Sequence, residues 1–273
     1  MTVPNGIVTL MTDFGTVDGY VAAMKGALLT TNRQAVLVDV THHISTQDIT
    51  EAAFQLATVW STFPEGTVHV VVVDPGVGGD RRAIVVEAGG HYFVTPDNGL
   101  LTLVVSNVPP TRAIVLDKIE HFRADVSSTF HGRDIFAPVA GLLAGGSVDM
   151  GDMGSEIAVD SIVRLPWAPA EDRQGQVRAP VVSVDRFGNC RTLLTRRELP
   201  LDLSKVYVRC KDVTIRGVQS TYSDVPMGKT LALWGSHGGL EIAVRGGSAA
   251  MSWEIQRGDD VIVFEEEPKR AQG

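Results

Sequence analysis

A histidine, an arginine and an aspartate lie within four consecutive positions of TFHGRDIFAP, residues 129–138. Histidine can move protons at neutral pH, and it is also one of the commonest metal ligands. A histidine flanked by apolar residues can equally be a hydrogen-bonded structural residue in a buried turn. The local pattern alone leaves three roles open for His131: catalyst, metal ligand or structural residue.

A second polar group follows a valine-rich run in VVVDPGVGGDRRAIVV, residues 71–86. The three glycines suggest a phosphate loop, but no helix and no Gly-Lys-Ser/Thr follow them, so neither nucleotide fingerprint fits. The glycines instead let the backbone approach a ligand and bring Arg81 back toward Asp74. The alternative is a strand-end aspartate that caps its own loop beside an exposed arginine.

A metal site is another interpretation of these residues. None of the seven histidines has the HxH or HExxH spacing that gathers ligands on one element, and His42 and His43 would point to opposite sides of a strand. A metal could still be held across strand ends by Asp13, His42, Asp74 and His131. Because the spacing gives this little support, we expect no resident metal.

The segment VDRFGNCRTLL, residues 184–194, places Asp185, Phe187 and Asn189 around a glycine. Glycine and asparagine together are common in β-turns, so a plain turn is one interpretation. The other is a purine site, in which the base stacks on the phenylalanine and the amide reads the base edge as both donor and acceptor. A similar glycine-rich polar stretch, WGSHGGLEIAVRGGSAA, occupies residues 234–250.

Alternating strands and helices must position the residues around His131 and the pair Asp74 and Arg81. Their periodicity predicts strand, helix, strand, helix and strand at residues 6–15, 18–32, 35–43, 45–64 and 67–75. Asp18 would begin the first helix, and Ser45 with Asp48 resembles a capping box for the second.

Such an order implies parallel strands joined by right-handed crossovers, with all carboxyl ends at one edge of the sheet. Each of the three strands ends in or near an aspartate, namely Asp13, Asp39 and Asp74. We expect these three carboxylates to converge on one rim.

The remaining chain predicts a hairpin over 83–96, a helix over 134–146 and, after a proline-rich stretch, only short alternating segments. We therefore expect an α/β fold: an N-terminal α/β domain with a mostly parallel sheet, residues 1–165, and a C-terminal all-β, barrel-like domain, residues 176–265. Residues 166–175 would link them.

Composition narrows the functional class. The chain has 273 residues, enough for two domains, and its net charge of −8 argues against a nucleic-acid partner. Cys190 and Cys210 form no CxxC pair, which argues against a disulfide framework or structural zinc site and favours the reducing cytoplasm. Neither a secretion signal nor an apolar run of about 18 residues is present, so we expect no export and no membrane insertion.

Six motifs together resemble one known family, the S-adenosyl-L-methionine (SAM) hydroxide adenosyltransferases, which are relatives of the SAM-dependent fluorinating and chlorinating enzymes. In the family's order, they are MTDFGTVDGYVAAMKG, VVDPGVGGDRRAI, YFVTPDNGLL, STFHGRDIFAPVA, VDRFGN and GSHGGLEIAVRGGSAA. The resemblance implies hydrolysis of SAM to adenosine and methionine, with SAM as substrate and no cofactor. It also implies a homotrimer whose active sites lie between the N-terminal domain of one subunit and the C-terminal domain of its neighbour.

The resemblance also implies roles for individual residues. The family's catalytic aspartate, arginine and histidine correspond to Asp74, Arg81 and His131. Its substrate-binding positions fall on Asp13 for the ribose, Asp18 and Ser236 for the methionine part, Phe187 and Asn189 for the adenine, and further on Phe130, Asp185 and Tyr222.

Departures from the halogenating relatives favour water as the nucleophile. Those relatives carry a Tyr-Ser pair where this chain has His131-Gly132 and a tryptophan where it has Gln47, and this chain has no long insertion near residues 90–110. A further departure, His237 in place of an arginine, concerns the contact with the methionine carboxylate. Arg81 stays protonated and cannot be the base, so Asp74 or His131 would accept the proton or hold the water. A SAM-dependent chlorinase, a metal-dependent hydrolase and a non-catalytic SAM- or adenosine-binding protein are the alternatives.

Overall fold

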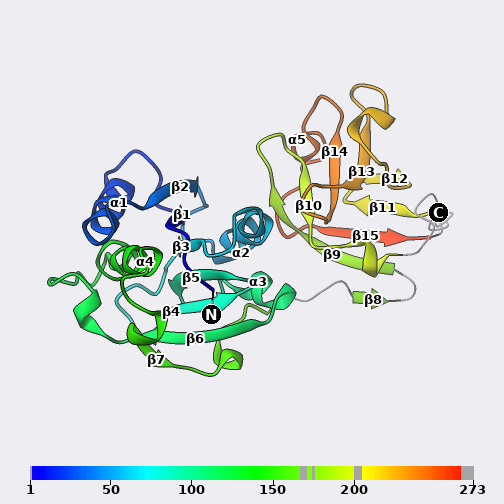
Figure 1. Cartoon of the computed structure of the whole chain (residues 1–273). Helices are drawn as coiled ribbons and strands as arrows, with labels where there is room; N and C mark the ends of the chain where they lie inside the picture. Colours follow the sequence, from blue (N-terminus) through cyan, green and yellow to red (C-terminus); the bar gives the residue numbers. More distant parts are fainter. Residues whose placement is uncertain (1, 167–170, 174–175, 200–204, 266–273) are drawn as a thin grey trace. The chain divides into compact units, whose positions relative to one another are not determined.

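The computed structural model describes residues 2–166, 171–173, 176–199 and 205–265. The chain divides into two compact units, Met1–Pro166 and Trp167–Gly273 (Figure 1). The expected linker, residues 166–175, lies partly outside the described residues, but Glu171–Arg173 is strand β8 and pairs with the next strand. In the described part of the chain, no helix is long and apolar enough to cross a membrane.

A mixed sheet of seven strands forms the centre of the first unit, in the order β2-β1-β3-β5-β4-β6-β7. The strands are β1 (Ile7–Thr12), β2 (Val36–Thr41), β3 (Val68–Val72), β4 (Ala83–Ala88), β5 (His91–Pro96), β6 (Pro110–Leu116) and β7 (Gly154–Glu156). The pairs β2-β1 and β1-β3 are parallel, which confirms the predicted parallel pairing, and β3-β5 is parallel as well. The other half is antiparallel because β4 and β5 form the predicted hairpin.

Helices cover both faces of this sheet. They are α1 (Tyr20–Thr31), α2 (Ile49–Val59), α3 (Thr102–Asn107) and α4 (Ala137–Ala144), with a π-turn, η3, at Gly132–Phe136 and short 3-10 turns at Trp60–Thr62, Ile119–His121, Met150–Asp152 and Val159–Ser161. Helices α1 and α4 pack side by side on one face, where Leu28 and Val139 join one core (Figure 1). On the other face Leu56 and Val104 join a second core. Each fully buried side chain of this size stabilises the fold by about 1.5–3 kcal/mol.

The two helix starts differ from the expectation in detail. Helix α1 begins at Tyr20 after Gly19, with no side-chain cap, so Asp18 does not cap it. At α2, Asp48 Oδ1 accepts the Glu51 N–H at 2.8 Å and Glu51 Oε2 accepts the Ser45 N–H at 3.0 Å. The capping pair is therefore Asp48 with Glu51, because the helix starts later than the apolar pattern indicates.

The second unit is an antiparallel sheet in the order β12-β11-β15-β9-β10-β14-β13, with β8 beside β9. Its strands are β9 (Gln176–Val184), β10 (Cys190–Thr192), β11 (Tyr207–Cys210), β12 (Val213–Arg216), β13 (Thr230–Trp234), β14 (Leu240–Val244) and β15 (Asp260–Phe264). Helix α5 (Ala249–Ser252) and 3-10 turns at Arg196–Glu198 and Tyr222–Asp224 complete it. A bridge between Gln219 and Leu233 helps to bring the two ends of the sheet together, so the barrel is nearly closed. The predicted fold class is confirmed.

Candidate active site

A cavity of about 240 Å³ lies at the carboxyl ends of β1 and β3. Because Thr12 is paired with Val72 in these parallel strands, Asp13 and Asp74 follow at the same edge. Both line the cavity, and Phe130, His131 and Gly132 line it from another segment.

The third expected carboxylate does not join them. Asp39 lies inside β2, paired in register with Leu10, and the strand continues to Thr41. Its carboxylate is 2.6 Å from Lys25 Nζ and 3.1 Å from His42 Nε2. The prediction of three converging aspartates is therefore wrong for Asp39, because its strand does not end there.

Arg81 connects Asp74 to His131. Arg81 Nε donates to the two Asp74 oxygens at 3.0 and 2.9 Å, and Nη2 donates to Oδ2 at 2.5 Å. The same Nη2 lies 2.8 Å from His131 Nδ1. The side chains of Asp74 and Arg81 are only 5% and 11% exposed, so water screens this contact weakly.

The direction of these hydrogen bonds defines the state of His131. A guanidinium only donates, so Nδ1 must accept with its lone pair, and the neutral ring carries its hydrogen on Nε2. Burial and the neighbouring Arg81 charge lower the pKa of His131 below its ordinary value of 6.5. The ring is therefore neutral at pH 7, with one N–H to offer a ligand.

Two glycines allow the segments around this group to approach closely. Gly78 has φ +76°, and a Cβ there would lie 2.2 Å from the Ser128 carbonyl oxygen. A Cβ on Gly132 would lie 3.1 Å from Met24 Sδ. The loop of Asp74 and Arg81 thus rests directly on the loop that leads to His131.

The buried carboxylate of Asp134 holds that second loop. It accepts Arg133 Nε and Nη2 at 2.6 and 2.8 Å and the Ser127 N–H at 2.9 Å. Although burial raises it, these hydrogen bonds keep the pKa of Asp134 below its ordinary value. The Arg133 guanidinium also lies over the ring of Phe130, with 4.9 Å to the centroid. Asp134 and Arg133 therefore fix the wall of the cavity.

Asp13 is held by the backbone rather than by a cation. Its Oδ2 accepts the N–H of Gln47 at 2.8 Å, and Gln47 has φ 63°, a conformation that costs a non-glycine residue free energy. Asp18 lies exposed in the turn before α1, outside the residues that line the cavity. Of the predicted N-terminal substrate-binding residues, Asp13 and Phe130 line it.

His42 lies away from the cavity. It is buried, with Nδ1 2.9 Å from Thr12 Oγ1 and its other nitrogen near Asp39, whereas His43 is exposed. Both residues lie beyond β2, which ends at Thr41, so the expected alternation of a strand does not apply to them. Within the described residues, no group of three or more histidine, cysteine, aspartate or glutamate side chains could hold a metal ion.

The second unit has its own cavity of about 810 Å³. The lining includes all the candidates from this part of the chain: Asp185, Phe187, Asn189, Tyr222 and Ser236. Asp185 Oδ1 accepts the N–H groups of Phe187 and Asn189, both at 2.9 Å, and the Phe187 side chain is 75% exposed. The β-turn predicted around Gly188 is present, and the residues predicted for a purine site line the same cavity.

Glu241 also lines this cavity, and the sequence analysis assigns it no role. It is 3% exposed and accepts a hydrogen bond from the Tyr222 hydroxyl. Burial raises the pKa of Glu241, and burial together with this carboxylate raises the pKa of Tyr222. The signal in the sequence is a charged residue, the second of five, in the otherwise apolar strand LEIAV.

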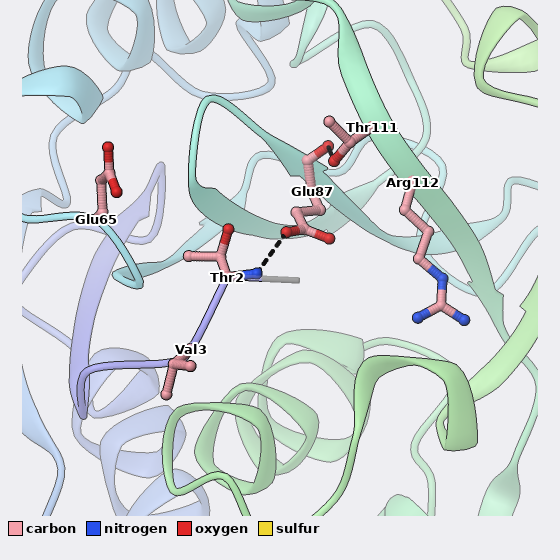
Figure 2. Close-up of a pocket in the computed structure, with 6 residues that line it drawn as sticks. All are labelled: Thr2, Val3, Glu65, Glu87, Thr111 and Arg112. Atoms are coloured by element: carbon pink, nitrogen blue, oxygen red, sulfur yellow. Dashed lines mark hydrogen bonds between the residues drawn. The ribbon is translucent and has the colours of Figure 1, made fainter.

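A third cavity, of about 790 Å³, is lined by Thr2, Val3, Glu65, Glu87, Thr111 and Arg112 (Figure 2). Glu65 precedes β3, so this cavity lies at the edge of the sheet opposite Asp13 and Asp74. Glu87 Oε1 accepts the backbone N–H of Thr2 at 3.1 Å, the contact drawn in Figure 2. None of the predicted site residues lines it.

Comparison with known proteins agrees with the two-unit structure. The chain matches the model of the SAM hydroxide adenosyltransferase N-terminal domain over residues 8–154 and that of the C-terminal domain over residues 179–262. Two proteins named (R)-S-adenosyl-L-methionine hydrolase, from Thermus thermophilus and Salinispora tropica, are each 38% identical to it. These alignments cover 92% and 95% of this chain and 96% and 98% of those proteins.

A more distant relative and a solved structure also match the chain over most of its length. A fluorinase from Nocardia brasiliensis is 27% identical over 96% of this chain and 99% of its own length. The crystal structure of an uncharacterized conserved protein from Thermotoga maritima superposes with a TM-score of 0.88 at 33% identity, covering 94% of this chain and 99% of that one. The chain therefore belongs to the SAM hydroxide adenosyltransferase family.

Proposed function

We propose that this protein hydrolyses SAM, with water attacking C5′ of the adenosyl group to give adenosine and methionine. The observation that carries the proposal is the buried contact from Asp74 through Arg81 to His131 at the ligand-facing edge of the sheet. Family membership and the 38% identity to two SAM hydrolases support it.

The sulfonium leaving group makes the chemistry simple. A neutral thioether departs with the C5′–S electron pair, so no general acid is needed, and the protein has only to hold and activate water. Arg81 donates once to Asp74 Oδ1 but twice to Oδ2, so Oδ1 keeps a lone pair that can accept a proton. The His131 lone pair already accepts from Arg81, which leaves only its Nε2–H.

These directions assign different tasks to the two candidate bases. In our proposal the water accepts from His131 Nε2–H and donates to Asp74 Oδ1. As the O–C5′ bond forms and the C5′–S bond breaks, the water proton passes to Asp74 Oδ1 and then to solvent. Arg81 stabilises the hydroxide-like charge of the transition state. His131 is then a positioning donor, and Asp74 is the proton acceptor.

The names of the hydrolase relatives specify the (R) configuration of SAM. We propose the same preference here, and the test is to incubate the protein separately with the two sulfonium epimers and follow products by chromatography. Adenosine from the (R) epimer, formed without halide and in the presence of a chelator, is the expected result. Product made only from the other epimer would contradict the stereochemical part.

Other products would favour the alternatives. Formation of 5′-chloro-5′-deoxyadenosine in chloride buffer would indicate a chlorinase, and loss of turnover with a chelator would indicate a metal-dependent hydrolase. Binding without product over hours would indicate a non-catalytic binding protein. The resemblance described above, in which a serine of the halogenating relatives corresponds to Gly132, argues against a chlorinase.

We further propose a cytoplasmic homotrimer whose sites combine the N-terminal domain of one subunit with the C-terminal domain of its neighbour. The predicted residues fall into two cavities in separate units, and Phe187 is exposed, which supports this arrangement. The test mixes Asp74→Ala with Asn189→Ala subunits after unfolding and refolding. Random assembly would restore about a quarter of the sites, whereas no restoration in mixed trimers would contradict shared sites.

A further inference from the structure

We infer that Glu241, acting through Tyr222, works together with Asp185 to fix the side-chain amide of Asn189 so that its oxygen faces the ligand. Glu241 is then a positioning residue that selects a nucleobase carrying an amino group. The inference rests on the proposed function for the identity of the ligand, an adenosyl compound. It adds which residues orient Asn189 and thereby determine the nucleobase that binds.

Glu241 occupies a place made for its carboxylate. It is the second residue of β14, is 3% exposed and accepts a hydrogen bond from the Tyr222 hydroxyl. A Cβ on Gly235 would lie 2.5 Å from Glu241 Oε2, so the glycine leaves the room that the carboxylate occupies. A buried carboxylate needs such a donor, and here the donor is the hydroxyl of Tyr222.

The orientation of Asn189 follows from carboxylates at both ends of a chain of hydrogen bonds. Asp185 Oδ1 accepts two backbone N–H groups, so Asp185 is an acceptor, and its Oδ2 lies 3.0 Å from Asn189 Nδ2. A flipped amide would place two oxygens together. The remaining Nδ2 hydrogen lies toward the Tyr222 oxygen at 3.4 Å, and that oxygen can accept because its own hydrogen goes to Glu241.

The amide oxygen is therefore the pole of Asn189 that remains for a ligand. Among the described residues, no donor forms a hydrogen bond with Oδ1, while Asn189 itself lines the cavity. An acceptor at this place requires a donor on the ligand. The 6-amino group of adenine provides one, whereas the 6-oxo group of hypoxanthine would bring a second acceptor. The sequence predicts that the Asn189 amide acts as both donor and acceptor toward the base, whereas the structure leaves only its acceptor for the ligand.

The test measures binding of adenosine and inosine to the full-length protein by calorimetry, with no turnover needed. Wild-type protein should bind adenosine roughly 10–100-fold more tightly than inosine. Tyr222→Phe keeps the ring but removes the relay, and Glu241→Leu removes the final acceptor. Both should reduce the ratio several-fold, because Asp185 alone then holds the amide. Glu241→Gln keeps an acceptor oxygen for Tyr222 and should retain the ratio.

Glu87→Leu is the matched control, because it removes a carboxylate that is 7% exposed in the other unit. It should leave the ratio unchanged. An unchanged ratio in Tyr222→Phe, or an equal loss of affinity for both nucleosides, would overturn the inference, as would a wild-type protein that binds inosine as well as adenosine. Selective binding of adenosine without hydrolysis of SAM would support the inference and contradict the proposed reaction.

Discussion

Replacing Gly78 with alanine tests whether the close contact between two loops sets the catalytic geometry. Gly78 lies between Asp74 and Arg81, has φ +76° and would place a Cβ 2.2 Å from the Ser128 carbonyl oxygen. Since Cβ atoms essentially never approach another heavy atom within 3.0 Å, the loops must separate by roughly 1 Å. Arg81 would then move relative to His131.

Two effects determine the magnitude. An alanine in the left-handed conformation costs about 1–2 kcal/mol, and separating the packed loops adds to this, so the free energy of unfolding should fall by about 1–3 kcal/mol. For a unit of this size, each kcal/mol lowers Tm by about 2–4 °C. A displacement of about 1 Å between reacting groups can lower the rate on the order of 100-fold. The change should therefore affect turnover more than folding.

The assay compares the thermal midpoint and the single-turnover rate of adenosine formation with those of Gly79→Ala. Gly79 is the matched control, because it does not have a left-handed φ and its Cβ would meet only the Gly76 oxygen, at 3.3 Å. Gly79→Ala should remain within a few-fold of wild type. If both variants have the same midpoint and the same rate, the argument from the contact with Ser128 is wrong.

Three further changes test other parts of the structure. Asp74→Asn should lower the rate of single-turnover adenosine formation about 10²–10⁴-fold, because it removes the proposed proton acceptor. The affinity for adenosine, measured by calorimetry, should stay within a few-fold of wild type. Unchanged turnover would contradict the role of Asp74 as proton acceptor. Asp134→Asn should weaken the hydrogen bonds of this side chain with the Ser127 N–H and with Arg133. KM should rise, and proteolysis between residues 123 and 130 should increase. A wild-type cleavage pattern would contradict the proposal that Asp134 holds this loop. Burial lowers the pKa of His69 to about 3, so its contribution to stability is complete above pH 6.5 and decreases by up to about 1.4 kcal/mol per pH unit as the pH falls toward 3. Urea unfolding between pH 7 and 4 should therefore show a smaller pH slope for His69→Gln than for wild type, and equal slopes would contradict the argument.

The parallel half of the first unit could be predicted because strands alternate with amphipathic helices in the sequence, and because the buried strand β3 lies in a continuous valine run. The placement of Asp13 and Asp74 followed directly from parallel pairing. Asp39 was misplaced although the predicted strand, residues 35–43, already extended beyond it. An aspartate in the middle of that strand was counted as a strand-end residue, and its carboxylate contacts Lys25 and His42 instead.

The candidate site was accessible from the sequence only in part. The glycine loop suggested the return of Arg81 toward Asp74, but the contact of Arg81 with His131 joins residues 50 positions apart and appears only in the folded chain. Glu241 was missed for a similar reason. Its partner Tyr222 lies in a separate turn, and a lone glutamate in a strand carries no spacing signal.

The two carboxylates of the N-terminal cavity differ in how their charge is balanced. Asp74 is neutralised by the full charge of Arg81, whereas the one hydrogen bond of the Asp13 carboxylate within the described residues is with the backbone N–H of the strained residue Gln47. With a neutral His131, the formal charge of this group is −1. A sulfonium substrate is attracted to that charge, and the neutral adenosine is not, so the same arrangement that gathers the substrate favours release of the product.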